Sequence, residues 1–379
     1  MRTLLKCAVG TGLAIGLTTT LAPIAGAQVL RGHDRDGHRV VYVQTDNTSG
    51  NQVVALKRAP NGTLSYDATY ATGGRGGALN GAKVDFLASQ GSLCYDAAAG
   101  LLLAVNAGSD TLSVFSVGDH GAVQLRQVID SGGTFPNSIT SFGDLVYVLN
   151  AENGGSVAGF LVRDGRLHVI PGSVRALGLT TPTDATQFTN TPGQVAFSPD
   201  GSQLVVTTKA TTSAIDVFSV RSDGRLSATP VVNVDAGAVP FAVSFDTANR
   251  LVVADAGTNA ISTYGLHDDG TATLFRTVAT GQKATCWIAQ ARGYFYASNA
   301  GSGNLSTLRT GPLRLLGATT STDPGTVDAA ATPEGHFLYV QTGLHGIVDE
   351  FAVGSNGALN EIGSVTVPSA VGGEGIVAL

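Results

Sequence analysis

The chain has 379 residues, and only 13% of them are charged, about half of the usual share. The formal net charge is −6 and no basic cluster or basic amphipathic face is present, so neither nucleic acid nor a membrane surface is an expected partner. There are 50 glycines, and aromatic and β-branched residues come in short runs instead of helical stripes, a pattern that indicates an all-β protein.

Residues 1–27 have the pattern of a secretory signal peptide. Two basic residues precede a mostly apolar run from Cys7 to Ala22, and Ala25-Gly26-Ala27 supplies a small-residue cleavage site. Thr and Gly interrupt the apolar run, which is also short for a membrane span, so a transmembrane anchor is the less favoured alternative. We expect cleavage after Ala27, a linker over 28–39, no membrane insertion after cleavage, and a protein that is secreted or held in the periplasm or cell envelope.

The rest of the chain, residues 40–379, repeats a unit of short strands. The second strand of each unit is rich in β-branched and aromatic residues and ends at a polar residue; these residues are Thr45, Asn106, Asn150, Thr208, Asp255, Asn299 and Thr342. Most of the intervals lie near 44 residues, the length of a four-stranded propeller blade. Seven units predict one domain, a seven-bladed β-propeller with four antiparallel strands per blade.

The third strand of each unit follows the polar residue after a short loop. Its predicted starts are Asn51, Thr111, Ser156, Ala214, Ala260, Asn304 and Ile347. The fourth unit is the most complete copy: a Ser198-Pro199-Asp200-Gly201 turn joins its first two strands, and a Ser222-Asp223-Gly224 turn leads toward its fourth.

The two ends of the domain predict how the ring closes. Val40 to Val43 is already second-strand material, so blade one lacks its first strand, while the chain ends on an unattached strand, Gly375 to Leu379. This strand is expected to take the innermost place of blade one, which removes an open sheet edge.

Two intervals are longer than the others, from Thr45 to Asn106 and from Asn150 to Thr208. The excess maps to loops over 73–91 and 175–191, each between the outer strand of one blade and the inner strand of the next. Strand alternation places both loops on the same face as the polar second-strand ends. Long loops of this kind are commonly binding loops or lids, although packing over the hydrophobic rim is an alternative.

The inner strands are expected to line a narrow, hydrated channel with small and polar residues, at Ser92, Ser138, Gln194, Ala242, Cys286, Asp328 and Gly375. Asp328 and nearby Glu374 are the acids expected to face it, unless they are solvated or cap backbone groups. Lys209 directly follows a polar second-strand end where other units have Ala. It either holds a carboxylate or phosphate at the channel mouth or extends into solvent.

No general catalytic or metal-binding motif is present, and the seven histidines show no ligand spacing, so no metal or cofactor is expected. Cys94 and Cys286 remain after signal cleavage and fall on inner strands of blades two and six. A disulfide needs Cα atoms within about 7 Å, so two buried free thiols are the favoured interpretation; a disulfide, a catalytic thiol and a metal ligand are the alternatives.

Several stretches carry a resemblance to a known family: SPDGSQLVV with AIDVFSVRSDGRL, the VVYVQT opening, TPEGHFLYVQTG and the closing EGIVAL. Together they resemble the seven-bladed propeller lactonases, which include 6-phosphogluconolactonases and carboxymuconate-lactonizing enzymes, and in particular their exported bacterial members. The resemblance implies the propeller fold and lactone hydrolysis. At the comparable blade, Thr191-Pro192-Gly193-Gln194 and Thr207-Thr208-Lys209 lack the Arg, His and Glu of the family pattern, so no catalytic residue carries over.

Two functions of different classes follow. As an enzyme, the protein hydrolyses a small lactone of the sugar-acid or muconate type, with Glu374 or Asp328 activating water and Lys209 stabilising the oxyanion or holding an acidic group. As a non-catalytic propeller, it binds a small anionic ligand, a glycan or an envelope protein. In either case Gln194 and the seven polar second-strand ends are predicted to form the ligand face, and we expect a monomer.

Overall fold

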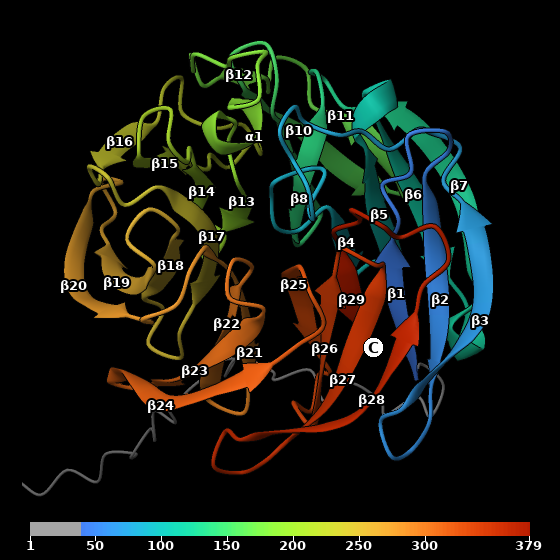
Figure 1. Ribbon diagram of the computed structural model, residues 1–379. Coiled ribbons are helices and arrows are strands. Elements are labelled where there is room, and N and C mark those ends of the chain that lie inside the picture. The colour runs from blue at the N-terminus through green and yellow to red at the C-terminus, as the bar shows by residue number, and fades with distance from the viewer. Residues whose placement is uncertain (1–38) are drawn as a thin grey trace, which may run out of the picture. The chain divides into compact units, whose positions relative to one another are not determined.

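The computed structural model describes residues 39–379, so the predicted signal peptide and, apart from Arg39, the linker lie outside the described residues. Over the described range the chain folds into seven antiparallel sheets arranged around a central axis (Figure 1). Six sheets have four strands, and the seventh gains one short extra strand. The predicted seven-bladed propeller is therefore confirmed.

In each blade the strands run in order from the axis outward. Blade one contains β29 (Ile376–Ala378), β1 (Val40–Gln44), β2 (Gln52–Arg58) and β3 (Leu64–Ala71). Blade two contains β4 (Leu93–Asp96), β5 (Leu101–Asn106), β6 (Thr111–Val117) and β7 (Val123–Asp130). Blade three contains β8 (Pro136–Phe142), β9 (Leu145–Asn150), β10 (Ser156–Arg163) and β11 (Arg166–Val169), with the short β12 (Arg175–Ala176) also on β10. Blade four contains β13 (Val195–Phe197), β14 (Gln203–Thr207), β15 (Ala214–Ser219) and β16 (Val231–Val234).

The remaining three blades repeat the same order. Blade five contains β17 (Pro240–Phe245), β18 (Leu251–Asp255), β19 (Ala260–Leu266) and β20 (Ala272–Ala279). Blade six contains β21 (Thr285–Ala291), β22 (Tyr294–Asn299), β23 (Asn304–Thr310) and β24 (Leu313–Ser321). Blade seven contains β25 (Thr326–Ala331), β26 (Phe337–Thr342), β27 (Ile347–Val353) and β28 (Leu359–Thr366). The helical turns of the described chain are α1 (Gln187–Asn190), η1 (Ala107–Ser109) and η2 (Asp119–Gly121).

The predicted third strands begin where the sequence placed them in six blades, and one residue later, at Gln52, in blade one. The outer strand of blade four differs from the prediction. The turn at 222–224 leads only to an isolated bridge between Val220 and Leu226, and the outer strand begins at Val231. A strand needs a run of residues with extended backbone, and the Ala228-Thr229-Pro230 stretch delays it because proline cannot donate to the ladder.

The predicted closure of the ring is confirmed. β29 pairs antiparallel with β1, with Val43 opposite Ile376 and Val41 opposite Ala378. The Gln44 amide donates to the Gly375 carbonyl at 2.9 Å, and the Leu379 amide donates to the Val40 carbonyl at 2.9 Å. The last strand of the chain therefore occupies the innermost position of the first blade.

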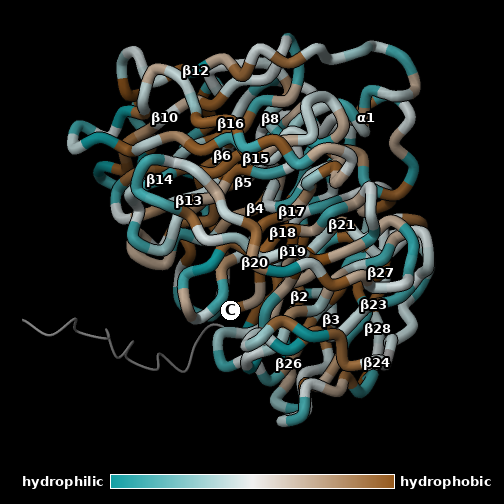
Figure 2. Tube along the Cα trace, turned by 90° about the vertical axis from the view of Figure 1, so that its left-hand side faces the viewer, coloured by the Kyte–Doolittle hydropathy of each residue, from teal (hydrophilic) through white to brown (hydrophobic). Residues whose placement is uncertain are grey.

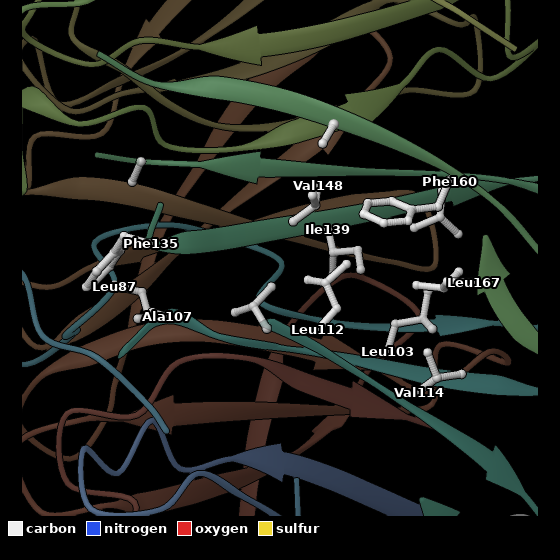
Figure 3. Packing of buried hydrophobic residues seen from close by; sticks show 14 of the residues in the cluster. Leu87, Leu103, Ala107, Leu112, Val114, Phe135, Ile139, Val148, Phe160 and Leu167 are labelled. Atoms are coloured by element: carbon white, nitrogen blue, oxygen red, sulfur yellow. The ribbon is translucent and has the colours of Figure 1, made fainter. Parts of the chain in front are cut away.

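The hydrophobic core lies between neighbouring blades. Hydrophobic stretches (brown) follow strands such as β4 and β18, whereas hydrophilic ones (teal) gather in turns (Figure 2). The largest cluster joins blades two and three, where Leu103 and Val114 face Val148 and Phe160 (Figure 3). Such packing of apolar faces supplies most of the stability of a repeat fold.

Four blades add a buried tyrosine three residues before the polar end of the second strand. Each hydroxyl donates to a glycine carbonyl in a turn of the next blade, at 2.6 Å, 2.8 Å, 3.1 Å and 2.7 Å for the pairs Tyr42 with Gly121, Tyr147 with Gly224, Tyr296 with Gly357 and Tyr339 with Gly62. These four bonds fix the spacing of adjacent blades. Within residues 39–379, no helix has the length and apolar character needed to cross a membrane.

Candidate functional site

The first long loop, residues 72–92 between β3 and β4, crosses the axis of the ring; we call it the axial loop. The Ser89 hydroxyl donates to the Asn137 carbonyl of blade three at 2.7 Å, while the Trp287 indole of blade six donates to the Ser89 carbonyl at 2.6 Å. The Gln90 side chain pairs twice with the Ile288 backbone, at 2.9 Å and 3.1 Å. One loop therefore contacts inner strands of opposite blades.

This arrangement corrects the expectation of a hydrated channel. The residues predicted to line it are all buried: Ser92, Ser138, Gln194, Ala242, Cys286, Asp328 and Gly375. The axial loop closes the axis because its main chain hydrogen-bonds to the inner strands, as when the Ile139 amide of β8 donates to the Gly91 carbonyl at 2.8 Å. Small residues along the axis make room for a loop, not for water alone.

Asp85 organises the part of the axial loop that enters the axis. Its Oδ1 accepts from the Leu87 amide at 3.0 Å and the Ala88 amide at 2.9 Å, and its Oδ2 accepts from the Ser89 amide at 3.0 Å. Burial raises the pKa of the Asp85 carboxyl to about 7, while the charge of Lys209 and these amide donors favour ionisation. On one side the loop also packs Leu87 against Ala107 and Phe135 (Figure 3).

Lys209 joins the axial loop to the second long loop, residues 177–194 between β12 and β13, which we call the outer loop. Its Nζ donates to the Ala88 carbonyl at 2.6 Å, the Phe188 carbonyl at 2.6 Å and the Thr191 hydroxyl at 3.1 Å. The side chain is 1% exposed, so the alternative that it extends into solvent is wrong. Burial lowers the pKa of Lys209 to about 7 against the opposing charge of Asp85.

Glu374 and Asp328 lie close together beneath the axial loop. Glu374 is fully buried, and its Oε2 lies 3.2 Å from the Ser89 hydroxyl oxygen. Burial raises the pKa of Glu374 well above its usual value, and the nearby carboxyls of Asp328, Asp85 and Asp46 raise it further. Burial also raises the pKa of Asp328 to about 7 and that of Asp46 to about 8. Carboxyls this close share protons because they cannot all carry charge.

The predicted ligand-face residues take part in pairing within and between blades. Thr45, Asn106, Asn150, Thr208, Asp255, Asn299 and Thr342 are all 2% exposed or less. In two blades the amide donates to a serine hydroxyl on the third strand, from Asn106 to Ser113 at 2.8 Å and from Asn299 to Ser306 at 2.9 Å. Gln194 links two blades, since its Oε1 accepts from the Val243 amide at 2.6 Å. Their role as ligand contacts stays a prediction.

Two adjoining cavities open on the face that carries both long loops. The blade-6 lobe has a volume of about 290 Å³ and the blade-5 lobe a volume of about 350 Å³. Four residues line both lobes, and we call them the waist: Phe188 of the outer loop with Phe241, Ala284 and Cys286 of the inner strands and the turns before them. We refer to the two lobes together as the cleft.

The two lobes differ in the residues beyond the waist. The blade-6 lobe is lined by the axial loop and blade six, including Lys83, Val84, Asp85, Ala88, Trp287 and Ala300. The blade-5 lobe is lined by Thr189, Lys209, Ala210, Val239, Ala256 and Gly257. Of the residues proposed from sequence for chemistry, Lys209 therefore lines the cleft, whereas Glu374 and Asp328 lie outside both linings.

The repeat explains why the cleft lies at blades five and six. An alanine follows the polar second-strand end in several blades. In blades two and three these residues, Ala107 and Ala151, are buried in the cluster that also contains Leu79 and Leu87 of the axial loop. In blades five and six the equivalent Ala256 and Ala300 remain partly exposed and line the lobes. The long loops cover one side of the face and leave the other open.

The two cysteines are free, as predicted, and Cys286 is buried while Cys94 is only half-buried. Cys286 lines the waist, but burial raises its thiol pKa to about 12, so it stays protonated and is a poor nucleophile. No group of three or more His, Cys, Asp or Glu among residues 39–379 is arranged to hold a metal ion.

Sequence reasoning missed Asp85 and the aromatic residues of the cleft. Asp85 lay within a loop marked as unusual in length, and Trp287 is the one tryptophan in the chain. Phe241 and Trp287 pack edge to face with ring centroids 4.9 Å apart, and Lys209 Nζ lies 5.3 Å from the Phe241 centroid. Phe241, Trp287 and Lys209 belong to three different blades, so only the folded structure brings them together.

No protein family and no curated protein matches the chain by sequence. Several solved structures have the same fold. A protein from Bacteroides fragilis described as a "putative 6-phosphogluconolactonase" has a TM-score of 0.72 at 18% identity, over 90% of this chain and 98% of that chain. The periplasmic gluconolactonase of Pseudomonas aeruginosa has a TM-score of 0.69 at 17% identity, over 89% and 98%.

A protein from Lactobacillus plantarum is similar at a TM-score of 0.71 and 19% identity, over 90% of this chain and 99% of that chain. At these identities the likeness concerns the fold. The expected resemblance to lactonase propellers is thus confirmed at the level of architecture.

Proposed function

We propose that this propeller binds a small, largely apolar molecule in the cleft between the two long loops. The observation that carries the proposal is the lining: three aromatic side chains and several alanines surround two adjoining cavities, and few polar groups converge on them. Pockets of this size and composition are typical of small-molecule sites. Lactones are the ligand class to test first, because propellers of this architecture include a gluconolactonase.

The single tryptophan gives a direct test. Trp287 lines the blade-6 lobe, so a ligand that enters the lobe changes the intrinsic fluorescence of the purified mature protein. A panel of sugar-acid, muconate-type and aliphatic lactones is titrated while this signal is followed. Phe188→Ala removes the aromatic wall shared by both lobes and is expected to weaken binding about tenfold.

Phe275→Ala is the matched control, because Phe275 is an exposed phenylalanine on β20 that lines neither lobe. It should leave the affinity unchanged. The cleft would be rejected as the binding site if no lactone in the panel changed the fluorescence of Trp287. It would also be rejected if Phe188→Ala and Phe275→Ala lost the same amount of affinity.

Lactone hydrolysis in the same cleft is a second candidate, favoured by the position of Asp85. This carboxyl lines the blade-6 lobe, and burial raises its pKa to about 7, a value suited to a general base near neutral pH. In the proposed step, Asp85 takes a proton from a water molecule while the water oxygen bonds to the lactone carbonyl carbon. The tetrahedral intermediate then breaks its ring C–O bond, and the released alkoxide takes the proton back from Asp85.

Lys209 supports this candidate less directly than the sequence suggested. Its three hydrogens are donated to Ala88, Phe188 and Thr191, so its nitrogen holds the loops and favours the ionised form of Asp85 by its charge. A direct role for Lys209 toward the oxyanion, and a base role for Glu374 or Asp328, stay predictions.

Proton release from the lactone panel, followed in a pH-stat, tests hydrolysis. The rate should rise with pH through about 7, as Asp85 loses its proton. Asp85→Asn should lose hydrolysis while Trp287 fluorescence still reports ligand binding. Hydrolysis that persists in Asp85→Asn would contradict the role of Asp85. If the wild-type protein released no protons with any lactone of the panel, hydrolysis would be rejected and the binding proposal would remain.

We further propose that the protein works after export, as a monomer, in the periplasm, at the cell envelope or in the medium. The signal-like pattern of residues 1–27 supports export. Closure of the ring by β29 supports a monomer, because blade one keeps no open inner edge for another chain. Fractionation followed by N-terminal sequencing tests export, since a mature start at Gln28 is expected.

A further inference from the structure

We infer that a proton on the Glu374 carboxyl holds the axial loop in the axis of the ring, and that the loop loosens, with the seven blades intact, when this proton is lost at higher pH. The proton is held by contacts within the chain, so the device acts in the ligand-free protein and does not rest on the proposed binding function. The loop carries Val84, Asp85 and Ala88, which line the blade-6 lobe, so its position also determines the shape of that lobe.

Ser89 of the axial loop has one hydroxyl hydrogen and two close oxygen neighbours. The Asn137 carbonyl oxygen lies 2.7 Å from the Ser89 hydroxyl oxygen, and Glu374 Oε2 lies 3.2 Å from it. A carbonyl has no hydrogen to donate, so the shorter contact takes the hydrogen of Ser89. The contact with Glu374 is therefore a hydrogen bond only when Glu374 carries a proton on Oε2 and donates it to Ser89.

A second contact of Glu374 also needs a proton. The side chains of Asp328 and Glu374 are hydrogen-bonded to each other, although an ionised carboxylate is only an acceptor. At least one of the two carboxyls must therefore be protonated. Asp328 lies on β25 in blade seven, and Glu374 lies two residues before β29. Together the two contacts join blade seven, the segment that closes the ring and the axial loop.

Glu374 has weaker hydrogen-bond donors than the neighbouring buried carboxyls. The Ser92 amide approaches its Oε1 only to 3.4 Å. Asp85 accepts from three amides at 3.0 Å or less. Asp46 accepts from the Gln44 side chain at 2.6 Å and from the Glu374 amide at 2.8 Å. A buried carboxylate is costly unless donors compensate its charge, so of these three groups Glu374 is the one best suited to keep a proton.

The charges that face Glu374 also favour its protonated form. Burial raises the pKa of Glu374 well above its usual value, and the carboxyls of Asp328 on β25, Asp85 on the axial loop and Asp46 after β1 raise it further. The opposing charge in this region is that of Lys209 in blade four, which acts on Asp85 and lowers the pKa of that carboxyl. The positive charge is thus placed to favour ionisation of Asp85 and not of Glu374.

The effect of pH on the seated loop follows from these directions. A carboxyl with a raised pKa stabilises the seated state fully below its ordinary pKa of about 4, and this contribution is lost as the pH rises through the raised value. Burial lowers the pKa of Lys209 to about 7, so Lys209 acts in the opposite direction and favours the seated loop above about pH 7. Four carboxyls oppose this one lysine, so the net result of raising the pH is a looser loop. Cys286 stays protonated over this range because burial raises its pKa to about 12.

Trp287 reports the seating of the loop, because its indole donates to the Ser89 carbonyl at 2.6 Å. The fluorescence of the purified, ligand-free protein is followed from about pH 5 to about pH 10, and far-UV circular dichroism is recorded on the same samples. The wild-type protein is expected to show a reversible fluorescence transition at constant circular dichroism. Constant fluorescence across the range, or loss of the circular dichroism signal in the same step, would overturn the inference.

Two substitutions should move this transition in opposite directions. Glu374→Gln keeps a donor for Ser89 at every pH, so the transition should disappear or move up by about one pH unit or more. Asp328→Asn removes a neighbouring negative charge and offers an amide donor to Glu374, which lowers the pKa of Glu374 and should move the transition to lower pH. A transition that stays in place in either variant, or moves the same way in both, would show that the proton on Glu374 does not hold the loop.

Asp349→Asn is the matched control. Asp349 on β27 is also a buried carboxyl, and burial raises its pKa to about 7. Its Oδ2 accepts from the Asp323 amide at 2.8 Å, away from the axial loop. This variant should leave the fluorescence transition at the wild-type pH. A shift as large as that of Glu374→Gln would mean that Trp287 responds to buried charge anywhere in the ring, and would reject the specific role of Glu374.

Discussion

The polar residue at the end of the second strand is buried in every blade, and its type determines whether a titratable group is buried there. Asn106 and Asn299 donate to serine hydroxyls seven residues later, and both amides are neutral at any pH. Blade five has Asp255 in this place, which accepts a hydrogen bond from Ser262, also seven residues later. The second carboxyl oxygen of Asp255 is buried without a partner. Burial raises the pKa of Asp255 to about 7.

Asp255→Asn is therefore expected to stabilise the protein in a pH-dependent way. A carboxyl whose pKa is raised on folding keeps its proton in the folded state, so wild-type stability falls as the pH rises from about 4, the unfolded value, to about 7. The variant lacks this loss and should gain on the order of 2 kcal/mol above pH 7, and little near pH 4. Urea unfolding across this pH range measures the difference.

Asn299→Asp is the reciprocal variant and should introduce the same loss into blade six. Equal pH profiles for wild type and Asp255→Asn would mean that the carboxyl of Asp255 is not protonated on folding. At this scale the sequence was a good guide to position, because the spacing of polar residues located all seven corners. The sequence did not predict what these residues bind, because an asparagine at a strand end is the same residue whether its side chain contacts a ligand or a serine of the same blade.

Among the elements, the two long loops contact each other directly, as at Asn80 and Gln187, and a buried side chain of blade four also joins them. Lys209 is the residue whose nitrogen reaches both the axial loop, at Ala88, and the outer loop, at Phe188 and Thr191. Lys209→Met keeps the length of the side chain but leaves these acceptors without a donor and Asp85 without its counter-charge. A loss of about 3 kcal/mol or more is expected, as for other broken buried polar pairs.

Urea unfolding measures this loss, and limited proteolysis locates it. In Lys209→Met both loops should become cleavable, at 72–92 and 177–194, while the blades stay protected. Lys83→Met is the control, because Lys83 lies on the same axial loop but is exposed. If Lys209→Met resists proteolysis as well as the control does, the loops are held by their other contacts and Lys209 does not join them.

The sequence located these loops by their excess length but could not show where they go. The axial loop is fixed by contacts between distant parts of the chain, such as Ser89 with Asn137 and Ser89 with Trp287, 48 and 198 residues apart. No local pattern predicts such pairs. The sequence singled out Lys209 because it follows a polar strand end where other blades have alanine. It could not predict whether Lys209 is buried or exposed, because that depends on the loops that cover it.

For the whole molecule, the strand repeat was sufficient to predict the architecture. Each blade has the same period, and the unpaired strand at the C-terminus had one free edge to fill, so blade count and closure followed from local pattern alone. The cleft could not be predicted from the repeat, because it lies where the two long loops no longer cover the face of the propeller. Its lining comes from blades four, five and six and from both loops.

Closure also makes the ring sensitive to the last few residues. β29 supplies the inner strand of blade one, and Ile376 and Ala378 are buried in the cluster between blades seven and one. Arg58 additionally donates from Nη2 to the Leu379 carbonyl at 3.0 Å. Removing residues 372–379 would expose the edge of β1 and delete Glu374 from beneath the axial loop.

The truncated protein is therefore expected to unfold or aggregate, because an uncovered central strand offers unpaired backbone groups to other chains. Size-exclusion chromatography and thermal unfolding followed by circular dichroism measure the effect. A synthetic peptide with the sequence of residues 372–379, added during refolding, should restore a monomeric ring, whereas a scrambled peptide should not. A truncated protein that stays monomeric and melts like the full chain would show that the pairing of β29 with β1 contributes little to holding the ring closed.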